Sequence, residues 1–573
     1  MKKLIAFILL ISLILISQII KAYTLNYSII GINNTDALQN ALNRLNVAAE
    51  NNGAPLSLDD INNFQATASD NIQKALQPYG YFKSQISTQL THSGANYRAS
   101  YHVVPGPQMH ITQINLTVTG DGANNNVILH FINHFPLQQG QVLNTQKYLD
   151  AKHALFNTAL QQGYIAAYFV QQQILIDLNN YTTVINLQLA TGPRYYFGPV
   201  YYNQNPFATS FLNRFIPFQQ GEPYSTDQLI NFQNALSNSN YFQQISVNGN
   251  PTKANNYQIP VTVNLIPKLA NLYTLGVGYG TDTGARATIG WDWRRASSSG
   301  NYLSTQLYMS QVQDSLQAKY VIPGENPLTD QYNITAGALT TNINQGNSRT
   351  YQVGVNQIKT MGNWQQTISL NYQFERYQFT DQPYQNSALL LPGISWLNIT
   401  KNDPVYPTQG NRFSLSIQGS AEALFSTTSF IQGELQDKYI FSPTDDSRVI
   451  LRTDIGYTVV HDFNALPLSL RFYAGGSQSV RGYEYQSLGL PDGGRYLIVG
   501  SGEYQHQIYG NWSGAIFYDA GNAFDNFNQG LDRGAGIGVV YKTPIGPFEL
   551  TLGKAYNLPG NPLKVQFSMG PDL

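Results

Sequence analysis

The sequence contains no cysteine among its 573 residues. This absence excludes disulfides, thiolate metal sites, a cysteine nucleophile and an N-terminal lipid-anchored cysteine. Charge is also scarce: Asp, Glu, Lys and Arg make up 11% of the chain, and the 32 basic and 33 acidic residues form no basic block. Nucleic acid is therefore not an expected partner.

Long apolar runs are missing after the N-terminus, whereas the chain holds 39 tyrosines, 27 phenylalanines and 48 glycines. This composition is unlike that of a helical membrane protein and is compatible with a membrane β-barrel, whose strands alternate apolar and polar residues. The length exceeds what one core usually organises, so we expect two or more domains.

The N-terminus has the order of a secretory signal peptide. Lys2 and Lys3 precede an apolar run from Leu4 to Ile20, and Ala22 ends it. We predict a signal peptide over residues 1–22, removed after Ala22. A retained membrane anchor is the alternative, because Ile20 is a poor residue three positions before a cleavage point.

Three segments between residues 23 and 268 repeat one order of elements: a strand, a glycine-led helix start, a helix ending before an aromatic pair, and an alternating closing strand. The predicted helix caps are Ser57, Asn144 and Ser225. Gly or Asn precedes the tyrosine that ends each helix, as a left-handed terminal turn requires. We predict three small α+β modules, 23–106, 107–192 and 193–268, with generic spacer domains as the alternative.

Residues 269–573 alternate instead with the period of strands, as in Leu303, Thr305 and Leu307 against Ser304 and Gln306. We count sixteen strands, although fourteen or eighteen would also fit the length, since a membrane strand needs about 9 to 11 residues. Unpaired backbone is not tolerated in lipid, so the sheet must close. The predicted fold class is mixed: three α+β modules followed by an antiparallel transmembrane β-barrel.

Two predicted strands carry glycine on one face: Gly276, Gly278 and Gly280 in the first, and Gly534, Gly536 and Gly538 in a later one. If the apolar residues between them face lipid, the glycines leave bare backbone in the lumen, against which another element could lie. Equally, these glycines could simply ease the curvature of the barrel.

One long connection, "GGSQSVRGYEYQSLGLPDGGR", contains a single charged Arg481 between Val480 and Gly482. The strands that follow carry Glu503 and Asp519, and a carboxylate facing lipid would cost about 2 kcal/mol or more. Both should therefore point inward, where the planar guanidinium of Arg481 could bridge them. Gly482 would allow the sharp turn, and Tyr483 would supply packing.

Two motifs carry a family resemblance. "SVRGYEYQ" resembles the loop signature, and "FYDAGNAF" the barrel F-x-D-x-G motif, of the outer-membrane assembly factors of the BamA and TamA superfamily. The three repeats resemble POTRA domains of the same proteins. The resemblance implies that the loop 461–493 enters the barrel and that Arg481 contacts Asp519 and Glu503. The residues that match the same motifs are Val480, Gly482, Tyr483, Phe517 and Gly521.

The number of modules points within this superfamily to the TamA branch, because two-partner secretion transporters usually carry two and BamA of many bacteria carries five. The resemblance then implies an outer-membrane barrel with periplasmic modules that inserts or exports unfolded outer-membrane β-proteins such as autotransporters. It also implies an inner-membrane-anchored, TamB-like partner. A two-partner secretion transporter or a BamA-like general assembly factor is the alternative, and a passive porin would not need three modules.

A physical mechanism for such a function is strand exchange at the seam between the first and last barrel strands, since an open edge templates an incoming strand. Gly276, Gly278, Gly280 and Pro562 would weaken this seam. With Leu275 expected to face Phe567 across it, a cross-link between them should block activity.

An enzyme is the rival class. "GGSQS" has Ser479 where a G-x-S-x-G motif needs its last glycine, and the eight histidines show no H-E-x-x-H or paired metal spacing. We therefore predict no enzymatic activity, no cofactor and no metal site, with a barrel phospholipase as the remaining enzymatic alternative.

Overall fold

The computed structural model describes residues 23–49, 56–489, 491–544 and 546–570, so the predicted signal peptide lies outside the described residues. The chain divides into two compact units. The first contains the residues up to 201 together with 218–231 and 248–262, and the second contains 202–217, 232–247 and the residues from 263 onward. None of the helices in the described ranges is both long and apolar enough to cross a membrane.

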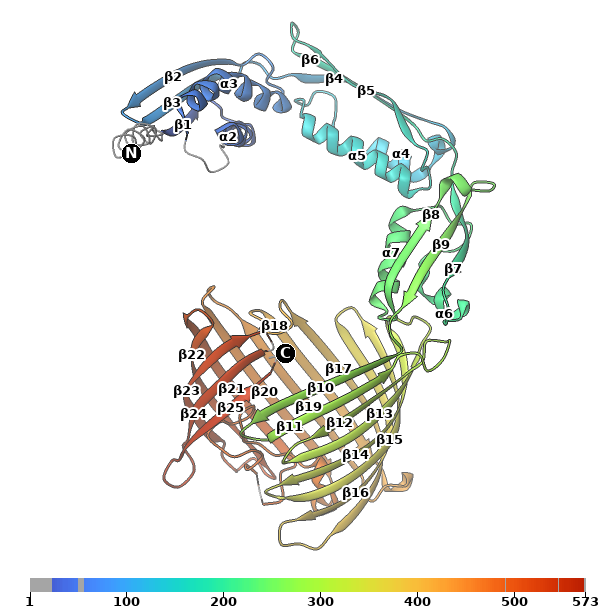
Figure 1. The fold of residues 1–573 in the computed structure, drawn as a ribbon, viewed down its shortest axis with the longest axis vertical. Helices are drawn as coiled ribbons and strands as arrows, with labels where there is room; N and C mark the ends of the chain where they lie inside the picture. Colours follow the sequence, from blue (N-terminus) through green and yellow to red (C-terminus); the bar gives the residue numbers. More distant parts are fainter. Residues whose placement is uncertain (1–22, 50–55, 490, 545, 571–573) are drawn as a thin grey trace, which may run out of the picture. The chain divides into compact units, whose positions relative to one another are not determined.

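Each module is a three-stranded sheet in which the closing strand lies in the centre, with orders β1-β3-β2, β4-β6-β5 and β7-β9-β8 (Figure 1). The first strand of each of the first two modules pairs in parallel with the central one. The first module contains β1 (Thr24–Ile30), α2 (Thr35–Ala49), α3 (Leu58–Leu76), β2 (Gln85–Ser93) and β3 (Asn96–Val104). The second contains β4 (His110–Thr119), α4 (Asn126–Asn133), α5 (Thr145–Gln161), β5 (Tyr168–Asp177) and β6 (Thr182–Ala190). The third contains β7 (Tyr196–Asn203), α6 (Thr209–Leu212), α7 (Thr226–Asn238), β8 (Phe242–Gly249) and β9 (Gln258–Pro267).

The helix ends of the modules follow the predicted chemistry. The Ser57 side chain accepts from the Asp60 N–H, and Asn144 accepts from the Lys147 N–H, so two of the predicted caps are in place. The residues before the three terminal tyrosines are all left-handed: Gly80 at φ 87°, Gly163 at φ 89° and Asn240 at φ 65°.

The second half is one sixteen-stranded antiparallel sheet, which confirms the predicted barrel and strand number (Figure 1). Its first eight strands are β10 (Asn271–Gly280), β11 (Gly284–Trp293), β12 (Tyr302–Met309), β13 (Gln313–Pro323), β14 (Asp330–Ile343), β15 (Gly346–Met361), β16 (Trp364–Phe379) and β17 (Gln385–Lys401). The other eight are β18 (Gly410–Ser420), β19 (Phe430–Phe441), β20 (Ser447–Val460), β21 (Tyr496–Tyr509), β22 (Trp512–Phe524), β23 (Asp532–Thr543), β24 (Gly546–Ala555) and β25 (Leu563–Met569). Each strand pairs with its neighbour in the chain, so β10 and β25 are the two edges.

Within the second unit, part of the third module packs against the start of the barrel. The Tyr241 hydroxyl donates to the Gly300 carbonyl at 2.7 Å, and the Arg214 guanidinium donates to the carbonyls of Pro323 and Gly324 at 3.1 and 2.9 Å. The Phe211 ring occupies the space where a Cβ of Gly300 would lie. These contacts join the third module to the β11–β12 and β13–β14 connections of the barrel.

Candidate functional site

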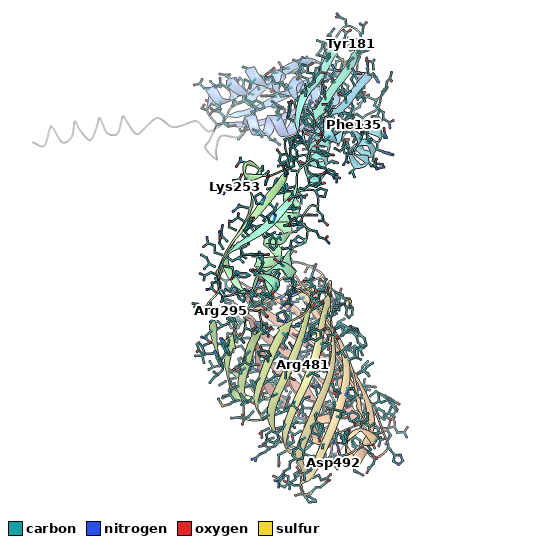
Figure 2. The ribbon with its side chains drawn as sticks, turned by 90° about the vertical axis from the view of Figure 1, so that its right-hand side faces the viewer. Phe135, Tyr181, Lys253, Arg295, Arg481 and Asp492 are labelled. Carbon is teal, nitrogen blue, oxygen red and sulfur yellow. The ribbon has the colours of Figure 1, made fainter. Side chains whose placement is uncertain are left out.

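The connection 461–495 between β20 and β21 is the long loop predicted from the sequence, two residues longer than the predicted 461–493. It is folded on itself through bridges between Phe472 and Gly494 and between Ala474 and Leu488. Val480 and Tyr483 are buried in a cluster that also contains side chains of β21, β22 and β24. Figure 2 shows Arg481 at about mid-height of the barrel, well away from Asp492 near one end.

Arg481 is fully buried, and the structure brings it together with both predicted carboxylates. Its Nε donates to Asp519 Oδ2 at 2.8 Å and its Nη2 to Asp519 Oδ1 at 2.9 Å, which is the bidentate geometry that a guanidinium offers a carboxylate. Its own backbone N–H also donates to Asp519 Oδ2 at 3.0 Å, and Nη1 forms an ion pair with Glu503. Arg481 thus binds β21 and β22 at once.

Three further contacts complete the arginine site, and only one of their residues was expected from the sequence. The guanidinium lies over the ring of Phe517, 3.6 Å from its centroid, which gives this motif residue a cation–π role. Glu549 of β24 accepts from Nη1 at 3.3 Å, and Ser501 Oγ bridges Arg481 and Asp519. Glu549 could have been predicted as a partner of Arg481, since it is an acidic residue in a predicted membrane strand. Nothing in the sequence distinguishes Ser501.

A second arginine shares this site. Arg452 of β20 contacts Glu503 at 3.4 Å, and its Nη1 donates to Gln478 of the loop at 3.1 Å. Two guanidinium groups therefore face three carboxylates within the lumen, and each charge has a partner. Such a set is costly to disrupt, because removing one member leaves a buried charge uncompensated.

Glycines let the loop tip lie on the barrel wall. Gly482 has φ 93°, and a Cβ there would meet the backbone of Lys554 and Ala555 at 3.0 Å. A Cβ on Gly553 would lie 2.8 Å from the Gly482 nitrogen, and one on Gly534 would overlap the Arg481 carbonyl. The expectation that the glycine face of β23 admits another element therefore holds at Gly534.

The other glycines behave differently. In β10, Gly276 and Gly278 have only Thr288 and Arg286 of the neighbouring strand within reach, and Gly280 has Thr283 and the Phe567 carbonyl. None of these nearest atoms belongs to a described residue of the loop, so the contact of another element with the glycine face is met by the loop at Gly534 and not at β10, where the glycines can ease curvature instead. The motif residue Gly521 serves pairing with β21, since a Cβ there would lie 2.8 Å from the Ile498 carbonyl oxygen. Gly536 is covered by the Phe517 ring, and Gly538 by Thr551.

The last strand is also tied to the loop tip. Gln566 of β25, which is buried, accepts from the Gly482 N–H at 2.9 Å and donates to the Tyr483 carbonyl at 3.2 Å. On the other side of the seam, the Ser477 N–H donates to Asp282 in the β10–β11 turn at 2.6 Å. The loop therefore contacts both edges of the sheet from the lumen.

The base of the loop has an anchor of its own on the opposite wall. The backbone N–H of Ser469 donates to Glu375 of β16 at 3.1 Å, and its hydroxyl donates to the same buried carboxylate. Arg471 donates to the carbonyls of Phe463, Asn464, Leu466 and Asp492. Its guanidinium also lies 4.0 Å from the Phe379 ring centroid. The loop is thus braced across the lumen between β16 and β21–β25.

Replacing Glu375 by glutamine tests this second anchor. Glutamine offers one acceptor oxygen where the carboxylate offers two, so we expect the base of the loop to open more easily by about 1.5 to 3 kcal/mol, the value of a charge-assisted hydrogen bond. Tryptic cleavage after Arg471, which is buried, should accelerate, while cleavage after the more exposed Arg495 serves as the reference. Unchanged cleavage after Arg471 would assign the anchoring to its carbonyl contacts alone.

The seam between β10 and β25 has no strand ladder among the described residues. Its contacts gather at one place, where the Thr281 N–H donates to the Phe567 carbonyl at 3.3 Å and the Phe567 N–H donates to Thr281 Oγ1 at 3.1 Å. Arg286 adds a bond to the Met569 carbonyl at 2.9 Å. Among the described residues the closure expected from the sequence is thus limited to this place; the rest of the β10 edge has no strand partner there, and Leu275 and Val277 are 80% and 86% exposed.

This register corrects one prediction. Leu275 does not face Phe567, because Thr281, six residues further along, does; at about 3.3 Å per residue the offset is about 20 Å. Pro562 lies directly before β25, where its carbonyl accepts from the Ala555 N–H at 3.1 Å. It therefore stands at the head of the last strand, as predicted, and ends the β24–β25 connection.

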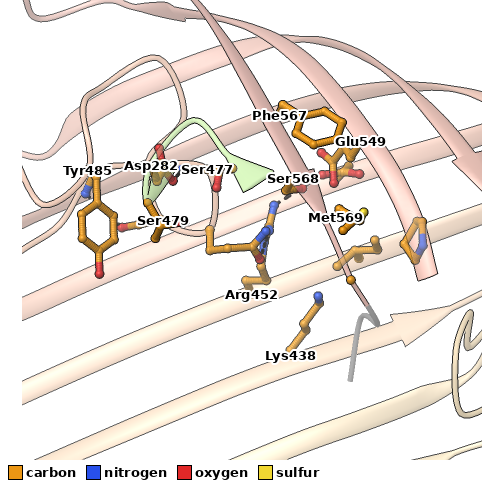
Figure 3. Close-up of a pocket in the computed structure, with 18 of the residues that line it drawn as sticks. Asp282, Lys438, Arg452, Ser477, Ser479, Tyr485, Glu549, Phe567, Ser568 and Met569 are labelled. Carbon is orange, nitrogen blue, oxygen red and sulfur yellow. Dashed lines mark hydrogen bonds and ion pairs between the residues drawn. The ribbon is translucent and has the colours of Figure 1, made fainter. Parts of the chain in front are cut away.

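A cavity of about 490 Å³ lies between the loop, the inner wall and the end of β25. Figure 3 shows Arg452 and Lys438 projecting into it from the wall, with Ser477 and Ser479 of the loop on one side and Met569 on the other. Its lining includes both basic and acidic side chains but no histidine. The part of the chain that the structure describes contains no cluster of three or more possible metal ligands.

Comparison with protein families decides the classification. The Omp85 superfamily domain matches residues 277–572, which is more than half of the chain. The protein belongs to the Omp85 superfamily. The POTRA domain described as TamA domain 1 matches residues 26–105, and the POTRA model described as a surface antigen variable number repeat matches residues 195–268. The barrel is therefore an outer-membrane β-barrel that follows POTRA modules.

Individual relatives of this Omp85 protein are distant. BamA from Haemophilus ducreyi lacking POTRA domains 1–3 is similar in fold, with a TM-score of 0.68 at 15% identity over 81% of this chain and 99% of that one. CdiB from Escherichia coli gives a TM-score of 0.47 at 13% identity, over 90% and 99% of the two chains. The chloroplastic outer envelope protein 80 of Arabidopsis thaliana is 36% identical over 91 residues, which are 14% of this chain and 12% of that protein.

Proposed function

We propose that this Omp85 protein is the outer-membrane component of a translocation and assembly module of the TamA type. It would insert or export unfolded outer-membrane β-proteins such as autotransporters, with its POTRA modules in the periplasm. The observation that carries the proposal is the seam. Within the described ranges its two edge strands share contacts at one place, and one lumenal loop contacts both from inside.

The open edge of β10 offers a place where an incoming strand can pair. In the part of the chain that the structure describes, the backbone N–H and C=O groups along β10 have no ladder partner on the β25 side, and an incoming strand can satisfy them by β-augmentation. The side chains of a client strand added at this edge would flank the exposed Leu275 and Val277 of β10 on the lipid-facing side. The edge can therefore template a strand before that strand has a barrel of its own.

The TamA-type assignment rests on the first module. Its match to the TamA domain 1 family supports it, as does the presence of three modules rather than two or five. A TamB-like, inner-membrane-anchored protein is the partner that this assignment implies. A two-partner secretion transporter or a BamA-like general assembly factor is the second candidate, and we propose no enzymatic activity for the protein.

Reconstitution of the full chain in liposomes tests the proposal. An unfolded autotransporter barrel domain added from outside should fold several times faster than in empty liposomes, as measured by the gel mobility of unheated samples. An eight-stranded barrel client, added in parallel, separates a selective module from a general assembly factor. No acceleration with either client, together with a large and steady single-channel conductance, would instead identify a passive porin.

A further inference from the structure

The turn 402–409 between β17 and β18 carries Tyr406 toward the arginine site from one end of the barrel. Because each of the sixteen strands is antiparallel to the next, the eighth strand, β17, ends where β10 begins. The loop that carries Arg481 enters from the other end, since it follows the eleventh strand, β20. The two connections thus approach one network from opposite ends.

The turn has a fixed shape. Asn402 Oδ1 accepts from the N–H groups of Thr408 and Gln409 at 3.0 and 3.1 Å. Asp403 Oδ1 accepts from the N–H groups of Tyr406 and Val405, both at 2.8 Å, and these bonds hold the pKa of Asp403 below its usual value. Tyr406 therefore projects from a preformed turn.

Tyr406 contacts three strands of the wall. The Arg448 guanidinium of β20 lies 4.2 Å from its ring centroid, and the Lys542 ammonium of β23 lies 4.8 Å from it. Both are within the range of cation–π attraction. Its hydroxyl donates to Gln505 Oε1 of β21 at 3.2 Å.

Gln505 links Tyr406 to the arginine site through hydrogen bonds on both sides of its amide. Its Oε1 accepts from both Tyr406 and Arg448, so its amide nitrogen is directed the other way, where it donates to Glu503 Oε1 at 2.6 Å. The other oxygen of Glu503 binds Arg481 and Arg452. Glutamine 505 is buried, which favours strong coupling between successive hydrogen bonds.

We propose that Tyr406 is a positioning residue of the Arg481 site, acting through Gln505 and Glu503. The turn 402–409 and the loop 461–495 are thereby coupled, and displacement of the turn weakens the hold on the loop tip. A polypeptide segment that enters the lumen at this end would meet the turn first. That last consequence rests on the proposed function, whereas the coupling rests on contacts within the barrel.

Hydrogen exchange of the full-length protein in detergent micelles tests the coupling without a client. The Arg481 and Gly482 amides donate to Asp519 and Gln566, so exchange of a peptide covering residues 476–485 reports release of the loop tip. Tyr406→Phe keeps the ring and removes one hydrogen bond. We expect exchange in this peptide to become about two to ten times faster, with exchange in the three modules unchanged.

Tyr384 provides a matched control, because its hydroxyl donates to Asn347 at 3.2 Å and Arg376 lies 4.6 Å from its ring centroid, outside the network. Tyr384→Phe should leave exchange in residues 476–485 as in the wild type. In a Gln505→Leu background, Tyr406→Phe should add no further acceleration, since the path is already broken. Unaltered exchange in Tyr406→Phe, or equal acceleration in both backgrounds, would overturn the proposal.

Discussion

Replacing Arg481 by alanine should release the loop tip and abolish most of the assembly activity while the barrel still inserts. The change leaves Asp519 fully buried without its bidentate partner, and it leaves Glu503 with Arg452 as its remaining ion-pair partner among the described residues and with the amide of Gln505. Breaking a buried pair in this way typically costs about 3 to 5 kcal/mol. Docking of the loop should weaken by a factor on the order of a hundred or more, since each 1.4 kcal/mol is tenfold. Client folding in liposomes, and tryptic cleavage after Arg471, which is buried in the loop and kept in every variant, would measure the two effects.

Two further variants distinguish the geometry of the Arg481 guanidinium from its charge, and its position from that of another arginine in the loop. Arg481→Lys keeps the charge but not the planar fork, so it should recover only part of the activity. Arg495→Ala removes an arginine from the same loop, where it pairs with Asp525 at a partly exposed position, and it should change little. If Arg481→Ala folded the client and resisted trypsin as the wild type does, Arg481 would not be needed to hold the loop tip. A reversed charge at Asp519 should reproduce the defect of Arg481→Ala from the wall side.

Locking the seam should have an equally large effect. The chain has no cysteine, so a Thr281→Cys, Phe567→Cys pair introduces the only disulfide that can form. These residues face each other through one backbone hydrogen bond and one bond from the Phe567 N–H to the Thr281 hydroxyl, and the cross-link would hold β10 and β25 together. If an incoming strand must enter between them, the oxidised protein should lose nearly all client folding and regain it on reduction.

The adjacent strand pair supplies the control. Leu550 and Phe567 are direct partners in the β24–β25 ladder, so a Leu550→Cys, Phe567→Cys disulfide links two strands that are already paired. It uses the same cysteine at position 567 and should leave activity intact. Equal activity of the oxidised and reduced Thr281–Phe567 pair would exclude strand entry at this seam.

The sequence predicted much of this architecture because its periodic signals are local. Glycine or asparagine at 80, 163 and 240 marks helix ends by backbone conformation alone, and the alternation of Val261, Val263 and Leu265 reports burial on one face of a strand. Sixteen strands could be counted for the same reason. Arg481 and its carboxylates could be paired because charge is rare in the barrel, so few partners compete.

Contacts between strands that are distant in the sequence were harder to predict. Gln566 and Ser501 bind the loop tip with neutral side chains of kinds found throughout the barrel, and nothing in their spacing distinguishes them. The register across the seam was wrong for Leu275 because no ladder or turn links β10 to β25 in sequence. Glu375 was missed because its partner is a backbone N–H and a serine, which carry no charge pattern.

The arginine site also imposes an order on folding. Asp519, Glu549 and Gln566 lie 38, 68 and 84 residues after the loop residues they bind, so the loop tip cannot dock until almost the whole chain has been placed. Contacts of such long sequence separation form late, because their loop-closure entropy must be met first. Burial of Arg481 therefore requires a complete barrel. A barrel that lacks its last strands would keep Arg481 exposed in an open loop, where a protease can cleave the chain.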